Sequence, residues 1–168
     1  MMSLLLLAAA APVASSPDLG KAEGQCRPNE QGPAYLVDVT GLKDRQGNLK
    51  LELYPATDKD FLADDNVLIN EGKPFRRVEV PVPQTGPVQL CIRAPSAGTY
   101  SLSLLHDRDS NRKMGLSVDG VGFPANKKVC WGQPKVSAAL AKVGNGPTRI
   151  NIVMMYRSQM VCFAPLKD

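Results

Sequence analysis

Oxygen-bearing side chains recur at alternate positions in one short segment of the chain. Asp107, Asp109 and Asn111 occupy every second position, and Asp119 follows in the same segment. Carboxylate and amide oxygens at alternate positions are typical of the start of a calcium-binding loop. These four residues are therefore candidate calcium ligands, and the sequence indicates no other cofactor.

The same segment departs from a calcium-binding loop at two defining positions. Such a loop has Gly at its sixth position and a bidentate Glu at its twelfth, where this chain has Arg112 and Val118. Arg108 and Lys113 add further positive charge, which disfavours a bound cation. Asp and Asn side chains also bond readily to the backbone of their own turn. The sequence thus favours a shaped turn over a metal site.

His106 stands directly before this segment, at the end of a predicted strand. A His beside Asp107 suggests a general base, but neighbouring residues on a strand point to opposite faces. Asp107 is therefore badly placed to orient His106, and no serine lies in a G-x-S-x-G turn. A hydrolytic site built from His106, Asp107 and Asp109 stays an alternative to a His that bonds a neighbouring backbone group.

Trp131 is the single tryptophan of the chain and a second candidate binding residue beside His106. Together with Tyr35, Tyr54 and Tyr156 it offers aromatic surface on which a sugar could stack. Aromatic side chains also bury large areas in protein cores. Packing within the core is therefore the favoured interpretation of these rings, and a carbohydrate platform is the alternative.

Alternation of apolar and polar residues predicts the framework that positions these side chains. In residues 49–54, for example, Leu49, Leu51 and Leu53 share one face. Fourteen Gly and fourteen Pro favour short elements joined by turns. The predicted strands are residues 34–42, 49–54, 75–82, 88–93, 99–106, 135–143, 148–156 and a short extension at 161–163. We expect an all-β fold, a single antiparallel β-sandwich of about seven strands and of immunoglobulin-like or transthyretin-like type.

The first two predicted strands are separated by a turn at residues 44–48, so we expect them to form a hairpin. Residues 57–72 are rich in Asp and too irregular for a clear helix, and we expect them to leave the sheet. Gly144-Asn145-Gly146-Pro147 predicts a tight turn before the last long strand.

The N-terminus has the features of an export signal. Residues 4–11 are Leu and Ala, and small residues follow at positions 14–16. The apolar run is too short to cross a bilayer as a helix. We therefore predict a signal peptide over residues 1–16, an N-terminal lead over 17–33 and a β-sandwich domain over 34–163. The mature protein is expected to be periplasmic or secreted, with no membrane span.

Four cysteines fit an exported protein with two disulfides. Cys91 lies on the strand face opposite Leu90, where it can reach a segment that crosses the sheet, and Cys130 is one candidate partner. Cys26 and Cys162 lie toward the two ends, so their pairing would join the termini. The three possible connectivities stay open. A zinc site is excluded because no two cysteines are closely spaced and the chain has one His.

Charge is distributed unevenly along the chain. Residues 1–72 contain 6 basic and 11 acidic residues, whereas residues 73–168 contain 14 basic and 5 acidic residues. The overall charge of +4 is too small to indicate nucleic-acid binding. A basic face for an acidic partner or a membrane surface is one interpretation. Packing of the acidic half beside the basic half is the favoured one.

Several motifs occur in an order that resembles a known family. These are LVDVTGL, GNLKLELY, AGTYSLSLLHD, an Asp-x-Asn at residues 109–111 and a Gly-x-Pro at residues 122–124. The order resembles the bacterial domain of unknown function family 2141, over about residues 35–156. The resemblance implies an exported single-domain β-sandwich and no established activity. Two segments depart from the family pattern, because Arg112 replaces a Gly and residues 126–131 lack the family's Glu and Gly-Phe-Ser.

Two classes of function follow from these observations. The first is a non-enzymatic exported module that binds or supports a component of the bacterial cell envelope, with a carbohydrate or an envelope protein as partner. The second is a calcium-binding or hydrolytic site at the His106–Asn111 loop. Because no enzymatic motif is present, we expect the first.

Overall fold

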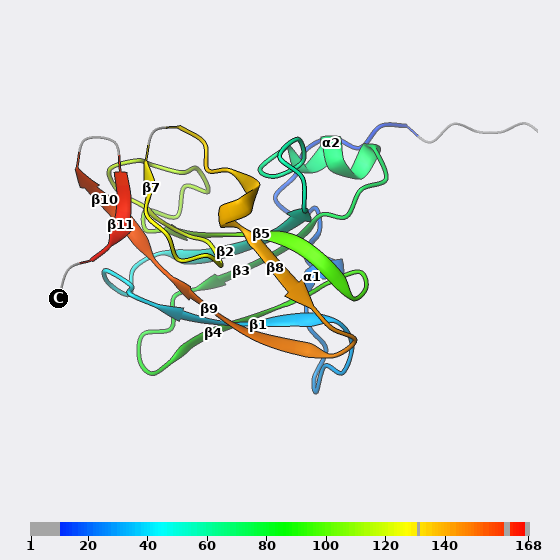
Figure 1. Cartoon of the computed structure of the whole chain (residues 1–168), viewed down its shortest axis with the longest axis horizontal. Coiled ribbons are helices and arrows are strands. Elements are labelled where there is room, and N and C mark those ends of the chain that lie inside the picture. The colour runs from blue at the N-terminus through cyan, green and yellow to red at the C-terminus, as the bar shows by residue number, and fades with distance from the viewer. Residues whose placement is uncertain (1–10, 131, 160–161, 167–168) are drawn as a thin grey trace, which may run out of the picture.

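The computed structural model describes residues 11–130, 132–159 and 162–166, and within these residues eleven strands form two sheets (Figure 1). The strands are β1 (Ala34–Thr40), β2 (Asn48–Pro55), β3 (Arg76–Pro81), β4 (Val88–Arg93), β5 (Gly98–Asp107), β6 (Gly120–Gly122), β7 (Val129–Cys130), β8 (Leu140–Val143), β9 (Pro147–Val153), β10 (Met155–Gln159) and β11 (Cys162–Pro165). Short helices occur at α1 (Lys21–Gly24), α2 (Asp65–Asn70) and the 3-10 turn η1 (Val136–Ala138).

The smaller sheet has the strand order β4-β1-β9 and the larger one the order β3-β2-β5-β6-β10-β11-β7, with β8 paired to the start of β5. The predicted all-β class is confirmed. The prediction of about seven strands in one simple sandwich is wrong. β6 and β7 span only two or three residues and are too short to show alternation, and the predicted strand at residues 148–156 belongs to two strands, β9 and β10. The immunoglobulin-like or transthyretin-like type stays a prediction.

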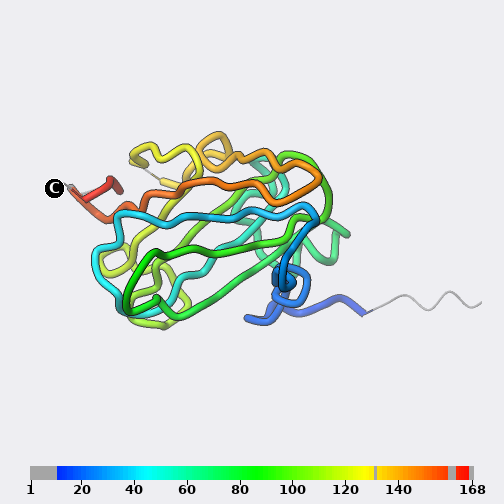
Figure 2. Tube along the Cα trace, turned by 90° about the horizontal axis from the view of Figure 1, so that it is seen from below, coloured from blue at the N-terminus to red at the C-terminus, as the bar shows by residue number. Residues whose placement is uncertain are grey.

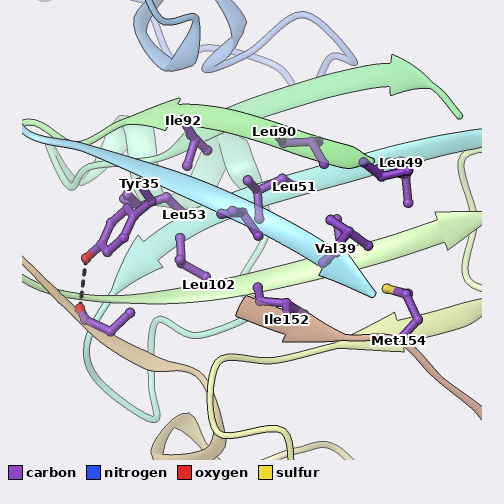
Figure 3. Packing of buried hydrophobic residues seen from close by; sticks show 14 of the residues in the cluster. Tyr35, Val39, Leu49, Leu51, Leu53, Leu90, Ile92, Leu102, Ile152 and Met154 are labelled. Atoms are coloured by element: carbon purple, nitrogen blue, oxygen red, sulfur yellow. Dashed lines mark hydrogen bonds between the residues drawn. The ribbon is translucent and has the colours of Figure 1, made fainter. Parts of the chain in front are cut away.

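The core fills the space between the inner faces of the two sheets (Figure 3). Leu49, Leu51 and Leu53 of β2 are fully buried there, as their alternation predicts. Tyr35 of β1 crosses the core and donates a hydrogen bond from its hydroxyl to the Ala141 carbonyl of β8 at 2.8 Å (Figure 3). Because strands alternate, the opposite side chains of β2 and β5 face outward, and those side chains line the site described below.

The predicted hairpin of the first two strands is wrong. β1 pairs with β4 and β9, whereas β2 pairs with β3 and β5, so residues 41–47 pass from one sheet to the other. The apolar faces of β1 and β2 meet across the core, which edge-to-edge pairing would not allow. Gly47 has φ +69°, and a Cβ there would lie 2.0 Å from the Asp107 carbonyl oxygen. This crossing therefore requires glycine at position 47.

One ladder is not antiparallel. β1 lies between β4 and β9, and its pairing with β9 is parallel (Figure 2). The predicted strand at residues 148–156 is broken at Met154, whose N–H donates to the Thr40 carbonyl at 2.8 Å. The residues before the break form β9 of the smaller sheet, and those after it form β10 of the larger sheet.

The N-terminal lead packs against the edges of both sheets. The Arg77 N–H donates to the Gly20 carbonyl at 3.0 Å, and Gln25 forms a bridge with Ile92 of β4. Gly24 lies so close to β3 that a Cβ would be 2.8 Å from the Arg77 carbonyl oxygen. The described part of the lead thereby covers unpaired strand edges.

Two disulfides join Cys26 to Cys91 and Cys130 to Cys162. The number of disulfides is confirmed, but the suggested pairing of Cys91 with Cys130 and of Cys26 with Cys162 is wrong. The segment that passes the outer face of β4 is the N-terminal lead, which places Cys26 there. Cys130 and Cys162 are directly opposite each other on β7 and β11. Two disulfides indicate a non-cytoplasmic environment.

Residues 1–10 lie outside the described residues, so the signal peptide stays a prediction. In the ranges that the structure describes, no helix has both the length and the apolar character needed to cross a bilayer.

Candidate functional site

The buried carboxylates of the loop after β5 bond to the loop's own backbone. Asp107 accepts hydrogen bonds from the N–H groups of Asn111 at 3.2 Å and Arg112 at 2.8 Å. Asp119 accepts from the N–H groups of Arg108 at 2.8 Å and Gly115 at 2.7 Å. Both Asp side chains are about 1% exposed. They hold the loop at its two ends.

In the exposed part of the loop, Asp and Asn side-chain oxygens also accept hydrogen bonds from nearby loop residues. Asp109 accepts from the backbone and side-chain nitrogens of Asn111, and the Asn111 side-chain oxygen accepts from the Lys113 N–H at 2.7 Å. The predicted shaped turn is confirmed. Arg112 has φ +63°, a left-handed backbone conformation that glycine adopts with less strain.

Three of the four predicted metal ligands are also close together. Asp107, Asp109 and Asp119 each have a carboxylate oxygen within 4.8 Å of the other two. Burial raises the pKa of Asp107, and the neighbouring Asp109 and Asp119 raise it further. Asn111, the fourth predicted ligand, is bonded to this group: its side-chain nitrogen donates to Asp109 at 2.8 Å, and its side-chain oxygen accepts from the Lys113 N–H.

His106 lies inside the protein with both ring nitrogens bonded. Nε2 is 2.8 Å from the Gln46 carbonyl oxygen, and Nδ1 is 2.6 Å from the Tyr156 hydroxyl. A carbonyl oxygen can only accept, so Nε2 carries the proton and Nδ1 accepts from Tyr156. The Tyr156 oxygen in turn accepts from the Lys43 N–H at 3.0 Å.

This environment makes His106 a structural residue. The side chain is 0% exposed, and burial lowers its pKa. A general base must reach a substrate proton, and His106 has no free nitrogen and no access to solvent. The placement therefore argues against the hydrolytic alternative and agrees with a His that bonds a neighbouring backbone group.

An open pocket lies on the outer face of the larger sheet, beside the loop. We call it the outer pocket, and its cavity volume is about 320 Å³. Volumes of 300 to 1,000 Å³ are usual for ligand sites, so this one suits a small ligand. Its lining comprises Lys50, Glu52, Leu62, Ser103, Leu105, Met114, Leu116, Val121, Phe123, Val129, Gly132, Gln133, Pro134 and Phe163.

Outward-facing positions of the central strands form the floor of the outer pocket. Ser103 and Leu105 of β5 alternate with the core residues Leu102 and Leu104, and Val121 lies between the two inward-facing glycines of β6. One side of the pocket meets a second apolar cluster under residues 57–72, which includes Phe61 and Phe123 at a ring distance of 6.1 Å.

The opposite wall of the outer pocket comes from the loop. Met114 and Leu116 line it, although they remain 43% and 60% exposed. Exposed apolar side chains beside an open cavity often mark binding sites. Trp131, a predicted binding residue, lies outside the described residues, but its neighbours Gly132 and Gln133 line the same pocket.

Ion pairs join the acidic and basic halves of the chain around this face. Arg77 bonds Glu52 at 2.8 Å and Asp65 at 3.2 Å, and Arg108 pairs with Asp44. The favoured interpretation of the charge asymmetry, packing of one half beside the other, is confirmed at these pairs. Because long-range pairing uses these charges internally, the asymmetry by itself does not define a basic binding face.

Fold and site together define an all-β, disulfide-bonded protein with an apolar pocket on the outer face of its larger sheet. The chain belongs to a family of uncharacterized proteins conserved in bacteria (DUF2141), whose model matches residues 37–151. Comparison with curated proteins and with solved structures gave no match. The family assignment agrees with the resemblance of the sequence motifs and adds no activity.

Proposed function

We propose that this protein is an exported, non-enzymatic binding module of the bacterial cell envelope and that the outer pocket is its ligand site. The observation that carries this proposal is an open, mostly apolar cavity on the outer face of the larger sheet, beside the ion pairs of Arg77 with Glu52 and Asp65. Loops that contribute to a pocket on a rigid sheet commonly bind ligands. Two disulfides support the exported location.

The lining favours an apolar ligand over a carbohydrate. Sugars stack on exposed aromatic faces. Of the two phenylalanines in the lining, Phe123 is 3% exposed and engaged with Phe61, and Phe163 is partly buried. Aliphatic side chains such as Leu105, Leu116 and Val121 form much of the wall. Hydrocarbon surface of a ligand would therefore be buried against them.

A neutral fluorescent probe, N-phenyl-1-naphthylamine, tests the pocket directly. We expect saturable binding to the full chain and a loss of affinity of at least about tenfold in Val121→Phe, because the larger ring fills the cavity. Val67→Phe is the matched control, since Val67 is 44% exposed on α2 and does not line the pocket. Absent saturable binding, or equal affinity of the two variants, would overturn the proposal.

A separate experiment tests the exported location. The protein is expressed in a bacterium with its native N-terminus, and the mass of the product is determined in periplasmic and cytoplasmic fractions. We expect a periplasmic product that lacks residues up to position 14, 15 or 16. A full-length product confined to the cytoplasm would refute the export part of the proposal.

Calcium binding at Asp107, Asp109, Asn111 and Asp119 is a second candidate function, favoured by the close approach of three carboxylates. A cation there would favour the ionised form of Asp107, whose pKa is raised by burial and by the neighbouring Asp109 and Asp119. Millimolar calcium is then expected to raise the melting temperature relative to EDTA in the wild type and not in Asp109→Asn. Identical melting curves with calcium and EDTA would exclude this function.

A further inference from the structure

One ammonium group at the polar end of the outer pocket lacks a close partner. Lys50 Nζ is 3.6 Å from Glu52 Oε1, and among the described residues it makes no hydrogen bond. The Lys50 side chain is 19% exposed. It lines both the outer pocket and an adjoining charged pocket that contains Arg112. An ammonium group has three donors, so Lys50 retains donors for a ligand.

Glu52 does not depend on Lys50 for its charge balance. Its Oε1 accepts from Arg77 Nε at 2.8 Å, and its Oε2 accepts from the Tyr54 hydroxyl at 2.8 Å. Burial raises the pKa of Tyr54 well above its ordinary value, so the phenol remains a donor. Arg77 thus neutralises Glu52 through a shorter contact than that of Lys50.

The acidic groups around Lys50 are matched in number by other cations. Asp65 shares Arg77 with Glu52, at 3.2 Å and 2.8 Å. Glu79 pairs with Lys21 at 3.4 Å and with Arg112 at 3.2 Å. The adjoining carboxylates are therefore compensated without Lys50, and its positive charge faces the cavity with one distant partner.

We infer that the outer pocket binds a small anionic amphiphile, whose single charged head group pairs with Lys50 and whose hydrocarbon body lies against the aliphatic wall. This inference rests on the proposed function and adds the chemical class of the ligand. The floor at Leu105 and Val121 supplies the apolar contact. A cavity of about 320 Å³ is at the small end of the range for ligand sites, so the hydrocarbon is a short chain or an aromatic body no larger than the probe.

Three ligands of equal chain length distinguish the contribution of the head group to affinity from that of the hydrocarbon. Octanoate, 1-octanol and octylamine are used to displace N-phenyl-1-naphthylamine from the full chain. We expect octanoate to bind roughly fivefold more tightly than octanol and octylamine to bind most weakly, as an ion pair at a partly exposed site would produce. In Lys50→Met the affinities for octanoate and octanol become equal.

Lys59→Met is the matched control, because Lys59 is 77% exposed and lies outside the outer pocket. It is expected to keep the preference for octanoate. Thermal melting of Lys50→Met verifies folding, and the ligand order of the wild type tests the inference without any variant.

The outcomes separate the two proposals. Equal binding of octanoate and octanol by the wild type, or an unchanged preference in Lys50→Met, overturns the head-group inference and leaves the apolar pocket standing. Failure of all three ligands to displace a bound probe likewise overturns the amphiphile inference. Absent saturable binding of the probe, or equal probe affinity in Val121→Phe and Val67→Phe, overturns the proposed function itself.

Discussion

The loop at residues 107–119 and the outer pocket are adjacent, but they use their side chains in opposite ways. In the loop, the carboxylates of Asp107 and Asp119 accept hydrogen bonds from the loop's own backbone. In the pocket, Leu116 and Met114 border open volume, and Lys50 has one distant partner. Polar residues that attract attention in a sequence can be fully engaged in holding a turn. The site that we propose for binding lies where the fold leaves apolar surface and a charge whose one partner is distant.

Removal of the two disulfides is expected to have the largest effects on stability and on probe binding. Removing either bridge by paired Cys→Ala substitution should lower the free energy of unfolding by about 4 kcal/mol, because each closes a loop of tens of residues. Only Cys130–Cys162 is flanked by pocket residues, namely Val129 and Phe163. Its loss should therefore also weaken probe binding. Urea denaturation and probe titration measure the two quantities, and an equal loss of affinity without Cys26–Cys91 would contradict the local role.

Removal of the buried loop carboxylates should have the next largest effect. Asp107→Ala and Asp119→Ala each leave two backbone N–H groups without their acceptor, at a cost of roughly 2 to 3 kcal/mol of unfolding free energy. Asp109→Ala is the matched control, since Asp109 is exposed and should cost less than about 1 kcal/mol. Urea denaturation provides the measurement. Equal losses in all three variants would show that burial of the carboxylates is unimportant.

The dependence of stability on pH reports on His106. Burial lowers its pKa from the ordinary value of 6.5, so near and below that pH the unfolded chain binds more protons than the native one. The free energy of unfolding should therefore fall as pH falls below 6.5, by about 1.4 kcal/mol for each unit of pKa depression. Asp107, whose pKa is raised, gives a slope of opposite sign at lower pH.

Substitution isolates the contribution of His106. His106→Gln cannot titrate, so the difference in unfolding free energy between wild type and variant should shrink as pH falls below 6.5. Denaturation with urea at several pH values measures this difference. A difference independent of pH would mean that His106 has an ordinary pKa in the folded protein.

The smallest expected effect concerns the exposed wall of the outer pocket. Leu116→Ser should change the free energy of unfolding by less than about 0.5 kcal/mol, since the side chain is 60% exposed. Probe affinity should fall by about twofold through lost apolar contact. Leu140→Ser is the control, because Leu140 is 41% exposed and lies outside the pocket. A larger loss of affinity in the control would remove Leu116 from the site.

Local sequence patterns predicted the positions of the strands better than they predicted which strands pair with each other. The alternation of Leu49, Leu51 and Leu53 specified which face of β2 is buried, and residues 88–93 form a strand with the predicted bounds. Alternation does not encode which strand lies alongside. The hairpin and the suggested disulfide pairing were wrong for this reason, because both depend on where residues 41–47 and the N-terminal lead pass across the sheets.

The candidate site likewise has one part that the sequence predicted and one part that it did not. The turn at Asp109 and Asn111 was predictable, because Asx side chains bond to nearby backbone. The outer pocket was not predicted, since its lining comes from segments between Lys50 and Phe163 that only the fold assembles. One local signal was present. Leu105 places an apolar residue on the strand face otherwise occupied by Ser101 and Ser103, and that residue became part of the pocket floor.

The parallel pairing of β1 with β9 also constrains how the chain reaches its native state. These strands, at residues 34–40 and 147–153, meet only when nearly the whole domain has been synthesised. Contacts between such distant residues slow folding, because loop closure must precede them. We therefore expect refolding in milliseconds to seconds and a chain that stays unfolded until its C-terminal strands are available. Such a delay would suit the export that we propose, because an unfolded chain can pass through a translocation channel.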